Sequence, residues 1–350
     1  MSRKYFYISI IVLLFVASSS FTDDNKYFKI TTEDVKLDFP KDFPKPLYEF
    51  TNNKPSPEGF TLGRKLFYDP ILSKDSSISC SFCHQRIAAF AHFDHPVSHG
   101  INGLLGNRNV PPLQNLIWQK EFMWDGGVNN LEVQPISPIT NPVEMNENLG
   151  DVIKKLQRNK NYVSMFRAAF GDSIVTSQKM LRALSQFTGL MVSSNSRYDK
   201  YMRHEDTLSK TELNGLKLFR DNCAQCHKEP LFTDYTYRNT GLKYDAAFKD
   251  SGRARITGQM KDFMKFKVPG LRNIGMTYPY MHDGRFRNLK QVLDHYSQKF
   301  DKSTGADPIL VKGISLSEQD KLDIIAFLKT LTDKTFLYDR RFADPNEARN

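Results

Sequence analysis

The sequence predicts a mainly α-helical protein in which one structural unit occurs twice. Apolar residues recur at the three- and four-residue spacing of helices in several segments, whereas strand-like alternation with hairpin turns is scarce. The pattern Gly-x-Lys-Leu-Phe occurs at residues 63–67 and again at 215–219, each time ahead of a pair of cysteines. A chain of 350 residues is also long enough for about two domains.

The composition is that of a folded globular chain. Hydrophobic residues make up 40% and charged residues 25%, which excludes a disordered chain, a collagen-like fibre and a multi-span membrane protein. Four cysteines are too few for a disulfide scaffold, and a chain of this length can bury a core without cross-links. The net charge of +10 could favour an acidic partner, but no dense basic block interleaved with aromatics predicts nucleic-acid binding.

The N-terminal residues 1–20 have the features of a secretory signal peptide. Arg3 and Lys4 precede an apolar run from Ile8 to Ala17, and small residues follow it. This run is shorter than the ~20 residues that span a bilayer, so an uncleaved anchor is the less favoured alternative. The sequence therefore predicts export to the periplasm. Residues 21–56 are polar and contain four prolines, with a fifth at Pro57 directly after them, which predicts an extended N-terminal arm.

Three helix faces are recognisable in the rest of the chain. They consist of Met180, Leu184, Phe187 and Met191; of Leu213, Leu216 and Phe219; and of Leu322, Ile325 and Leu328 after a capping box at Ser317 and Asp320. A polar stretch at 193–209 predicts a boundary between an N-terminal domain at 57–205 and a C-terminal domain at 206–335. A C-terminal tail at 336–350 follows. The loops at 85–150 and 228–285 exceed the usual loop length, which favours a function for them.

All four cysteines belong to two copies of Cys-x-x-Cys-His, the attachment signature of c-type haem. Two intervening residues let one turn of chain present both thiols to the two vinyl groups of a porphyrin, and the adjacent histidine can bind the iron as proximal ligand. The sequence therefore predicts two covalent haems. Their attachment residues are Cys80, Cys83 and His84 for the first haem, and Cys223, Cys226 and His227 for the second.

Three other uses of paired cysteines agree less well with the sequence. One zinc site made from both pairs would join distant segments and leave both trailing histidines without a role. A thioredoxin-like pair is expected once, in a βαβ setting. Two disulfides would not require a histidine after each pair. Export agrees with haem, since c-type haem is attached outside the bacterial cytoplasm.

Further motifs decide what the haems do. They are Gly-Asn-Arg-Asn-Val-Pro at 106–111, Phe-Met-Trp-Asp-Gly-Gly at 122–127, Gln-Pro-Ile-Ser-Pro-Ile-Thr-Asn-Pro-Val-Glu-Met at 134–145, Val-Pro-Gly-Leu-Arg-Asn at 268–273 and Tyr-Pro-Tyr-Met-His-Asp-Gly at 278–284. In this order they resemble the bacterial di-haem cytochrome c peroxidase family, including its branch of tryptophan-modifying maturation enzymes. The resemblance covers about residues 55–335. It implies two mostly helical cytochrome c-like domains with long loops, each carrying one covalent haem.

The resemblance also implies the catalytic residues. Glu144 matches the family's acid/base above the N-terminal haem, and Gln134 matches a companion amide that could hydrogen-bond peroxide. Peroxide must lose a proton on reaching the iron, and its outer oxygen must regain one before the O–O bond breaks, so one carboxylate can do both. Trp124 matches the tryptophan between the two haems, where an indole can carry electrons. Packing in the core is the alternative role for this residue.

Asn109, Thr277 and Pro279 match positions that hold a calcium ion at the domain interface of the family. They would supply an amide oxygen and backbone carbonyls, with waters completing the shell. The resemblance thus implies one calcium ion besides the two haems.

The sixth ligand of the C-terminal haem departs from the common family pattern. Many of these peroxidases place a methionine fourteen residues after the histidine that corresponds to His282, and this chain has Tyr296 there, as the maturation branch does. A thioether favours ferrous iron, whereas phenolate oxygen favours ferric and higher-valent iron. Met276 and Met281 are rival ligands, with core packing as the alternative role for both.

A second departure concerns a gating ligand. In many members a histidine on a mobile loop caps the N-terminal haem iron until the other haem is reduced. His99 lies at about the right distance after His84 for this role, and His92 and His95 are further candidates. Residues 101–103, however, resemble members whose loop carries no ligand, so both arrangements stay open.

Together these features predict an exported peroxidase that reduces hydrogen peroxide to water. The C-terminal haem would receive electrons from a small redox protein, either a c-type cytochrome or a copper protein, and pass them on through Trp124. Oxidative modification of a protein substrate, which Tyr296 favours, and non-catalytic electron transfer are the alternatives. A homodimer is one option for the assembly.

Overall fold

The computed structural model describes residues 28–346. The predicted signal peptide at 1–20 and the beginning of the predicted arm lie outside the described residues. The α-helices are α1 Pro57–Tyr68, α2 Cys80–Cys83, α3 Ile136–Thr140, α4 Leu149–Arg158, α5 Lys160–Phe170, α6 Ser177–Gly189, α7 Arg197–Met202, α8 Lys210–Asn222, α9 Ala254–Thr257, α10 Leu289–Tyr296, α11 Glu318–Thr330 and α12 Lys334–Leu337. None of the helices within 28–346 combines the length and the apolar character needed to cross a membrane.

The remaining regular structure is short. Strands β1 (Tyr237–Arg238) and β2 (Phe266–Lys267) pair antiparallel, with Tyr237 opposite Lys267. Single turns of 3₁₀ helix are η1 Glu33–Val35, η2 Pro70–Leu72, η3 Arg86–Ala88, η4 Ile101–Gly103, η5 Leu116–Trp118, η6 Met260–Asp262, η7 Ile274–Met276, η8 Lys302–Thr304 and η9 Arg340–Phe342. The predicted mainly helical class with long loops is confirmed.

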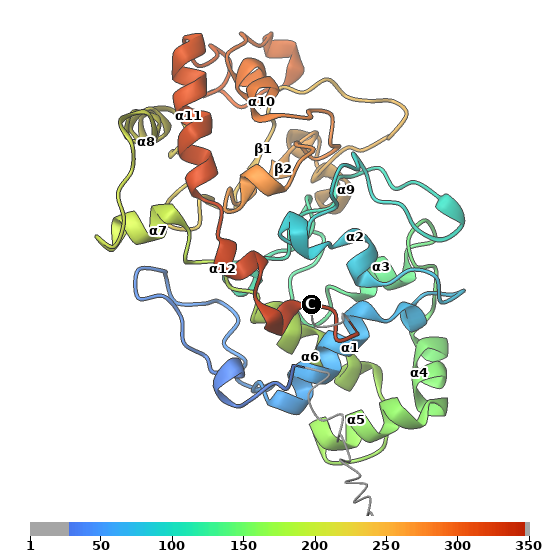
Figure 1. Ribbon diagram of the computed structural model, residues 1–350. Coiled ribbons are helices and arrows are strands. Elements are labelled where there is room, and N and C mark those ends of the chain that lie inside the picture. Colours follow the sequence, from blue (N-terminus) through green and yellow to red (C-terminus); the bar gives the residue numbers. More distant parts are fainter. Residues whose placement is uncertain (1–27, 347–350) are drawn as a thin grey trace, which may run out of the picture.

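The helices form two groups, each centred on a close helix pair (Figure 1). α1 packs against α6 in the N-terminal half, and α8 packs against α11 in the C-terminal half. The repeated glycines explain both pairs. A Cβ on Gly63 would lie 2.0 Å from the carbonyl oxygen of Ala183, and one on Gly215 would lie 1.9 Å from that of Asp323. Only a residue without a side chain permits backbones to approach this closely.

The N-terminal half has the larger core. The predicted face of α6 is buried, with Met180 and Phe187 at 0% exposure, and Met191 is buried just beyond the end of the helix. The segment ahead of α1 packs on this core through its few apolar side chains. Among them, Phe43 packs edge-on against Trp118, with ring centroids 5.1 Å apart.

The end of the chain returns to the same N-terminal core. Phe336 and Phe342 are buried there, although the sequence places them in the segment assigned to a tail at 336–350. Arg64 of α1 donates a hydrogen bond to the carbonyl of Arg341, which lies in η9.

The C-terminal core corrects two predicted helix faces. The capping box of Ser317 and Asp320 is present at the start of α11. Leu328 is buried as predicted and Ile325 is partly buried against the core, but Leu322 is 55% exposed. The fully buried side chains of this helix are Ile324 and Phe327. In α8, Leu216 and Phe219 are buried as predicted, but Leu213 is 39% exposed. Both errors arise because each helix carries apolar residues of its own on more than one face. The spacing of these residues therefore does not show which face packs against the core.

Candidate haem sites

The first Cys-x-x-Cys-His motif forms a single helical turn. α2 consists of residues 80–83, and the backbone N–H of His84 donates to the carbonyl of Cys80 at 2.9 Å. The His84 ring is held by its Nδ1, which lies 2.6 Å from the carbonyl oxygen of Phe90. Phe90 is buried and has a left-handed backbone with φ 62°. Such a conformation is rare for a bulky residue, so tertiary packing holds it in place.

The second motif repeats this arrangement. It follows directly on α8, and the N–H of His227 donates to the carbonyl of Cys223 at 3.0 Å. The ring Nδ1 of His227 lies 3.0 Å from the carbonyl oxygen of Phe232, which is also buried with a left-handed φ of 56°. The two motifs therefore share their local geometry over a whole turn of chain.

Both histidines have the chemistry of a metal ligand. Burial lowers the pKa of His84 to about 4 and also lowers the pKa of His227, so each ring is neutral near pH 7. A carbonyl at Nδ1 requires that nitrogen to carry the proton, which leaves the lone pair on Nε2 for iron. None of the four cysteines forms a disulfide, so all four sulfurs are available to a porphyrin. These donor sets fit a covalently attached haem at each motif.

A cavity of about 280 Å³ extends from the first motif to the seam between the halves. Its apolar lining includes Phe67, Ile78, Val110, Leu113, Leu184 and Leu231. Cys80, Cys83 and His84 line it from α2 and the residue after α2, and Glu144, Gln134 and Trp124 also line it. An apolar cavity with a few convergent polar groups suits a haem and a small oxidant.

Glu144 is held in this cavity by the loop at residues 98–101. The Ser98 hydroxyl donates to its Oε1 at 2.9 Å, and the N–H of Ile101 donates to its backbone carbonyl at 2.9 Å. A Cβ on Gly100 would lie 2.1 Å from that carbonyl oxygen, so only glycine allows this contact. Burial raises the pKa of Glu144, and the bonds from Ser98 and Asn141 offset part of this rise.

Gln134 and Trp124 also lie at the cavity. The Gln134 amide Nε2 contacts the sulfur of Met123 at 3.6 Å, a weak bond that a better acceptor can replace. The Trp124 indole N–H donates to the carbonyl of Asn109 at 2.8 Å, and its own carbonyl accepts from the N–H of Lys267 at 2.8 Å. Trp124 is thus fastened to both halves of the protein.

Several polar groups around Trp124 were not predicted from the sequence. Lys267 lines the cavity and donates from Nζ to the side chain of Gln119 and the carbonyl of Glu121, at 2.7 Å each. Burial lowers the pKa of Lys267 to about 7. Arg108 bonds Asp125, the residue after Trp124, and Asp250 of the C-terminal half, at 2.6 Å each. Arg108 belongs to a motif that carries the resemblance, but its partners are too distant in sequence to be predicted.

Tyr296, the predicted sixth ligand of the second haem, ends α10. Burial raises the pKa of its phenol, and the nearby thiols of Cys223 and Cys226 act in the same direction. The phenol therefore lies close to the second motif. Met276, a rival ligand, instead packs against the N-terminal core, and Met281 is half-buried with a left-handed φ of 76°.

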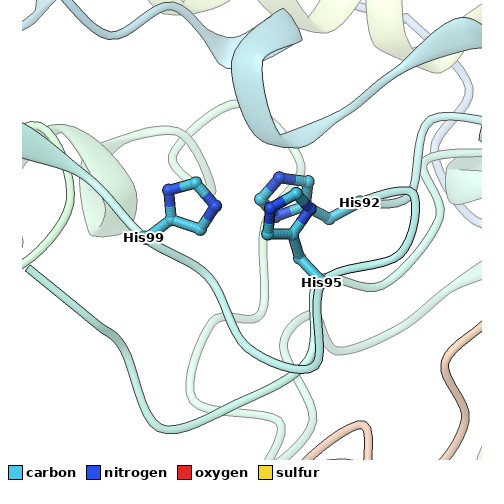
Figure 2. Close-up of side chains that lie close together, drawn as sticks. All are labelled: His92, His95 and His99. Atoms are coloured by element: carbon cyan, nitrogen blue, oxygen red, sulfur yellow. The ribbon is translucent and has the colours of Figure 1, made fainter. Parts of the chain in front are cut away.

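The loop histidines lie together near the first motif (Figure 2). The His99 ring is edge-on to Phe82 of α2, with centroids 5.2 Å apart, and it lies beside His92 and His95. The role of His99 as a cap of the N-terminal haem stays a prediction.

The residues predicted to hold calcium lie where the halves meet. Asn109, Thr277 and Pro279 are all buried. The N–H of Asn109 donates to the carbonyl of His282, and its side-chain amide donates to the carbonyl of Pro96 at 3.0 Å. That second bond leaves the amide oxygen of Asn109 as the atom available to a cation.

The two repeated motifs, in two helical halves that share a cavity, define a di-haem protein of the cytochrome c type. Comparison with known proteins agrees. A family model described as di-haem cytochrome c peroxidase matches residues 57–207, and a model described as cytochrome c matches residues 213–332. The chain belongs to the di-haem cytochrome c peroxidase family, and it is accordingly an oxidoreductase of the peroxidase class.

Individual relatives cover most of the chain. Methylamine utilization protein MauG of Methylorubrum extorquens is 35% identical over 286 residues, which are 80% of this chain and 79% of the relative. Cytochrome c551 peroxidase of Nitrosomonas europaea is 32% identical over 275 residues, with 77% and 79% covered. A solved structure described as a MauG-like protein associated with microbial copper homeostasis has a TM-score of 0.82 at 33% identity. It covers 89% of this chain and 99% of that one.

Proposed function

We propose that this peroxidase reduces hydrogen peroxide at the N-terminal haem with Glu144 as the acid/base. The observation that supports this role is the half-buried carboxylate in the cavity beside His84, bonded by Ser98 and with a raised pKa. The overall reaction takes one peroxide, two electrons and two protons to two waters. When bound, the haems supply the iron at which the O–O bond breaks and the capacity to store oxidising equivalents until two electrons arrive.

The chain's own groups handle the proton and position the substrate. The Glu144 carboxylate accepts the proton that peroxide loses and returns it to the outer oxygen, which leaves as water. The Gln134 amide, freed from its weak contact with Met123, donates a hydrogen bond to the bound peroxide. Trp124, held by Asn109 and bonded to β2 through Lys267, carries electrons between the halves.

The electrons come from a small protein, either a c-type cytochrome or a copper protein, that docks on the C-terminal half. His227 and Tyr296 would hold the iron of the haem that receives them. A phenol close to Cys223 and Cys226 supports this assignment over Met276, which packs elsewhere.

Steady-state peroxide consumption with a reduced c-type cytochrome tests this function. We expect Glu144→Gln to lower the rate by about 10²- to 10⁴-fold and to leave both haem spectra unchanged. Glu49→Gln is the matched control, since Glu49 is an exposed carboxylate paired with Lys45, and it should keep the full rate. No turnover by the wild type, in either the oxidised or the half-reduced form, would refute the peroxidase proposal. Full turnover by Glu144→Gln would remove Glu144 from it.

A second candidate is oxidative modification of a protein substrate. Tyr296 near the second motif favours it, because phenolate ligation stabilises higher-valent iron. If this is the physiological role, Tyr296→Met should raise peroxide turnover with a small donor and abolish modification of the partner.

The proposal also includes a calcium site where the two halves meet. A calcium ion would be held by the amide oxygen of Asn109 and the carbonyls of Thr277 and Pro279, all buried at the meeting of the halves. Treatment with a calcium chelator should lower turnover, and added calcium should restore it.

The periplasmic protein should begin after residue 20, which N-terminal sequencing of the mature chain checks.

A further inference from the structure

Three histidines that the proposed proton and electron transfers do not use form a cluster on the loop after the first haem motif. One of them, His99, also lines the cavity beside His84, so a site here is an alternative to its predicted role as a cap. His92, His95 and His99 converge in Figure 2, and their ligand atoms all lie within 4.8 Å of one another. Ring centroids are 4.2 Å apart for His92 and His95, 4.7 Å for His92 and His99, and 4.6 Å for His95 and His99. Within residues 28–346, no other group of three or more histidine, cysteine or acidic side chains has the spacing to hold a metal ion.

The buried member of the cluster, His92, has a ring nitrogen without a hydrogen-bond partner within the described chain. His92 is only 2% exposed, and the nitrogen concerned is its Nδ1. Burying a polar nitrogen without a partner costs about 1–3 kcal/mol, so packing alone is a poor reason to place a histidine there. The surrounding loop therefore points to a ligand.

The exposed member is already oriented for such a ligand. The Nδ1 of His95 lies 2.8 Å from the carbonyl oxygen of Phe93, so this nitrogen carries the proton and Nε2 carries the lone pair. A backbone carbonyl at the second ring nitrogen is the usual support of a metal-binding histidine. Asp94, the acidic residue within this loop, is engaged elsewhere, by Arg287 at 2.9 Å.

We propose that His92, His95 and His99 bind one late first-row transition-metal ion, of the class of zinc(II) and copper(II). Three imidazole nitrogens suit these ions, whereas calcium and magnesium prefer oxygen. Water completes a four-coordinate shell and leaves an exchangeable position.

The side chains need only a small adjustment to close around the ion. Nitrogens that share a tetrahedral zinc ion lie about 3.3 Å apart, compared with spans of up to 4.8 Å in the cluster. His92 and His95 stack with an angle of 15° between their rings, so one ring must turn to aim its lone pair at the ion. His95 is exposed, so its ring can tilt about the hydrogen bond to Phe93 without displacing core residues.

Zinc titration of the untagged, haem-loaded protein, followed by calorimetry, tests the site. Loaded haems matter because they occupy the cysteine thiols and the proximal histidines, which would otherwise bind zinc. We expect one zinc ion per chain in the wild type, and no binding of calcium at the cluster. His95→Ala should weaken zinc binding by more than about 100-fold, since loss of a supporting partner alone costs about 10- to 100-fold. Its exposed position makes misfolding of this variant an unconvincing explanation.

A matched control and a structural readout complete the design. His204 is exposed just after α7 and does not belong to the cluster, and His204→Ala should bind zinc like the wild type. X-ray absorption at the zinc edge should show three imidazole nitrogens. Zinc binding that survives His95→Ala unchanged, an all-oxygen shell, or no zinc binding by the wild type would each overturn the proposal.

Discussion

The two halves of the protein attach haem in the same way and differ in what faces it. In both, a helix with a close-contact glycine precedes the motif, and the proximal histidine bonds the carbonyl of a buried, left-handed phenylalanine. The first motif shares its cavity with the carboxylate of Glu144, whereas the second has the phenol of Tyr296 beside its cysteines. The attachment geometry is thus repeated in both halves, whereas the residues that surround each motif, Glu144 in a loop and Tyr296 at the end of α10, are not.

The halves also differ in how they are stabilised. The N-terminal core gathers the N-terminal segment ahead of α1, helices α1 to α6 and the end of the chain, whereas the C-terminal core is smaller and centres on α8 and α11. Arg272 links the two regions. It forms a fully buried pair with Asp199 at 2.8 Å, and its guanidinium lies 4.7 Å from the ring centre of Phe43 and 5.8 Å from that of Phe232.

Among the variants that test this difference between the halves, Asp199→Asn should change the free energy of unfolding most. Removing one charge leaves the Arg272 guanidinium buried without its partner, which costs about 3–5 kcal/mol of unfolding free energy. The C-terminal half, with its smaller core, should lose stability first. Urea unfolding of the haem-loaded protein measures this, and Asp206→Asn, at a more exposed pair with Arg197, is the control. Equal loss in both variants would show that the buried pair does not hold the seam.

The same pair predicts a pH dependence. Burial alone would raise the pKa of Asp199, but the bonds from Arg272 and Ser196 outweigh it and keep the pKa below its usual value. A depressed carboxyl pKa contributes stability above its unfolded value of about 4, and that stability is lost as the pH falls through the folded value. Unfolding free energy should therefore fall at acid pH more steeply in the wild type than in Asp199→Asn.

A matched pair of glycine variants tests the repeat itself. Gly63→Ala and Gly215→Ala each place a Cβ about 2 Å from a backbone oxygen of the partner helix, so each should cost about 1–3 kcal/mol. Gly150→Ala is the control, because its Cβ would meet a single side-chain oxygen, that of Asn148, at 3.3 Å and no backbone atom of another helix. Thermal unfolding compares the three. A cost in only one of the two repeat variants would show that the helix pairs are not equivalent, and no cost in either would refute the close-contact explanation.

A smaller effect should distinguish the N-terminal site. Ser98→Ala removes the hydroxyl that bonds Glu144, and we expect about tenfold slower peroxide turnover. Since this bond lowers the pKa of Glu144, its loss raises that pKa and moves the acid limb of the pH–rate profile to higher pH. Ser137→Ala, at another residue that lines the cavity, should leave the profile in place. A shift to lower pH would contradict the assignment.

The smallest effect is expected on the outer face of α11. Leu322→Glu alters a side chain that is 55% exposed and should change the unfolding free energy by less than about 0.5 kcal/mol. Ile324→Ala, at a fully buried position, should cost about 2–5 kcal/mol. Similar costs for both would mean that the C-terminal core extends further around the helix than the structure places it.

The sequence by itself determined the features that are local along the chain. A Cys-x-x-Cys-His motif occupies one turn, the capping box at Ser317 spans four residues, and the face of α6 follows from spacing alone. Motif order was enough to identify the family. These signals survive because neighbours in the sequence are neighbours in the structure.

Only the tertiary structure decided which distant groups meet. Nothing in the spacing of α11 selects Ile324 over Leu322, and no local signal pairs Ser98 with Glu144 or Arg272 with Asp199. The predicted tail returns to the N-terminal core through Phe336 and Phe342 for the same reason. Such contacts depend on how whole helices pack, and the burial that shifts a pKa or orients a carboxylate exists only once they have packed.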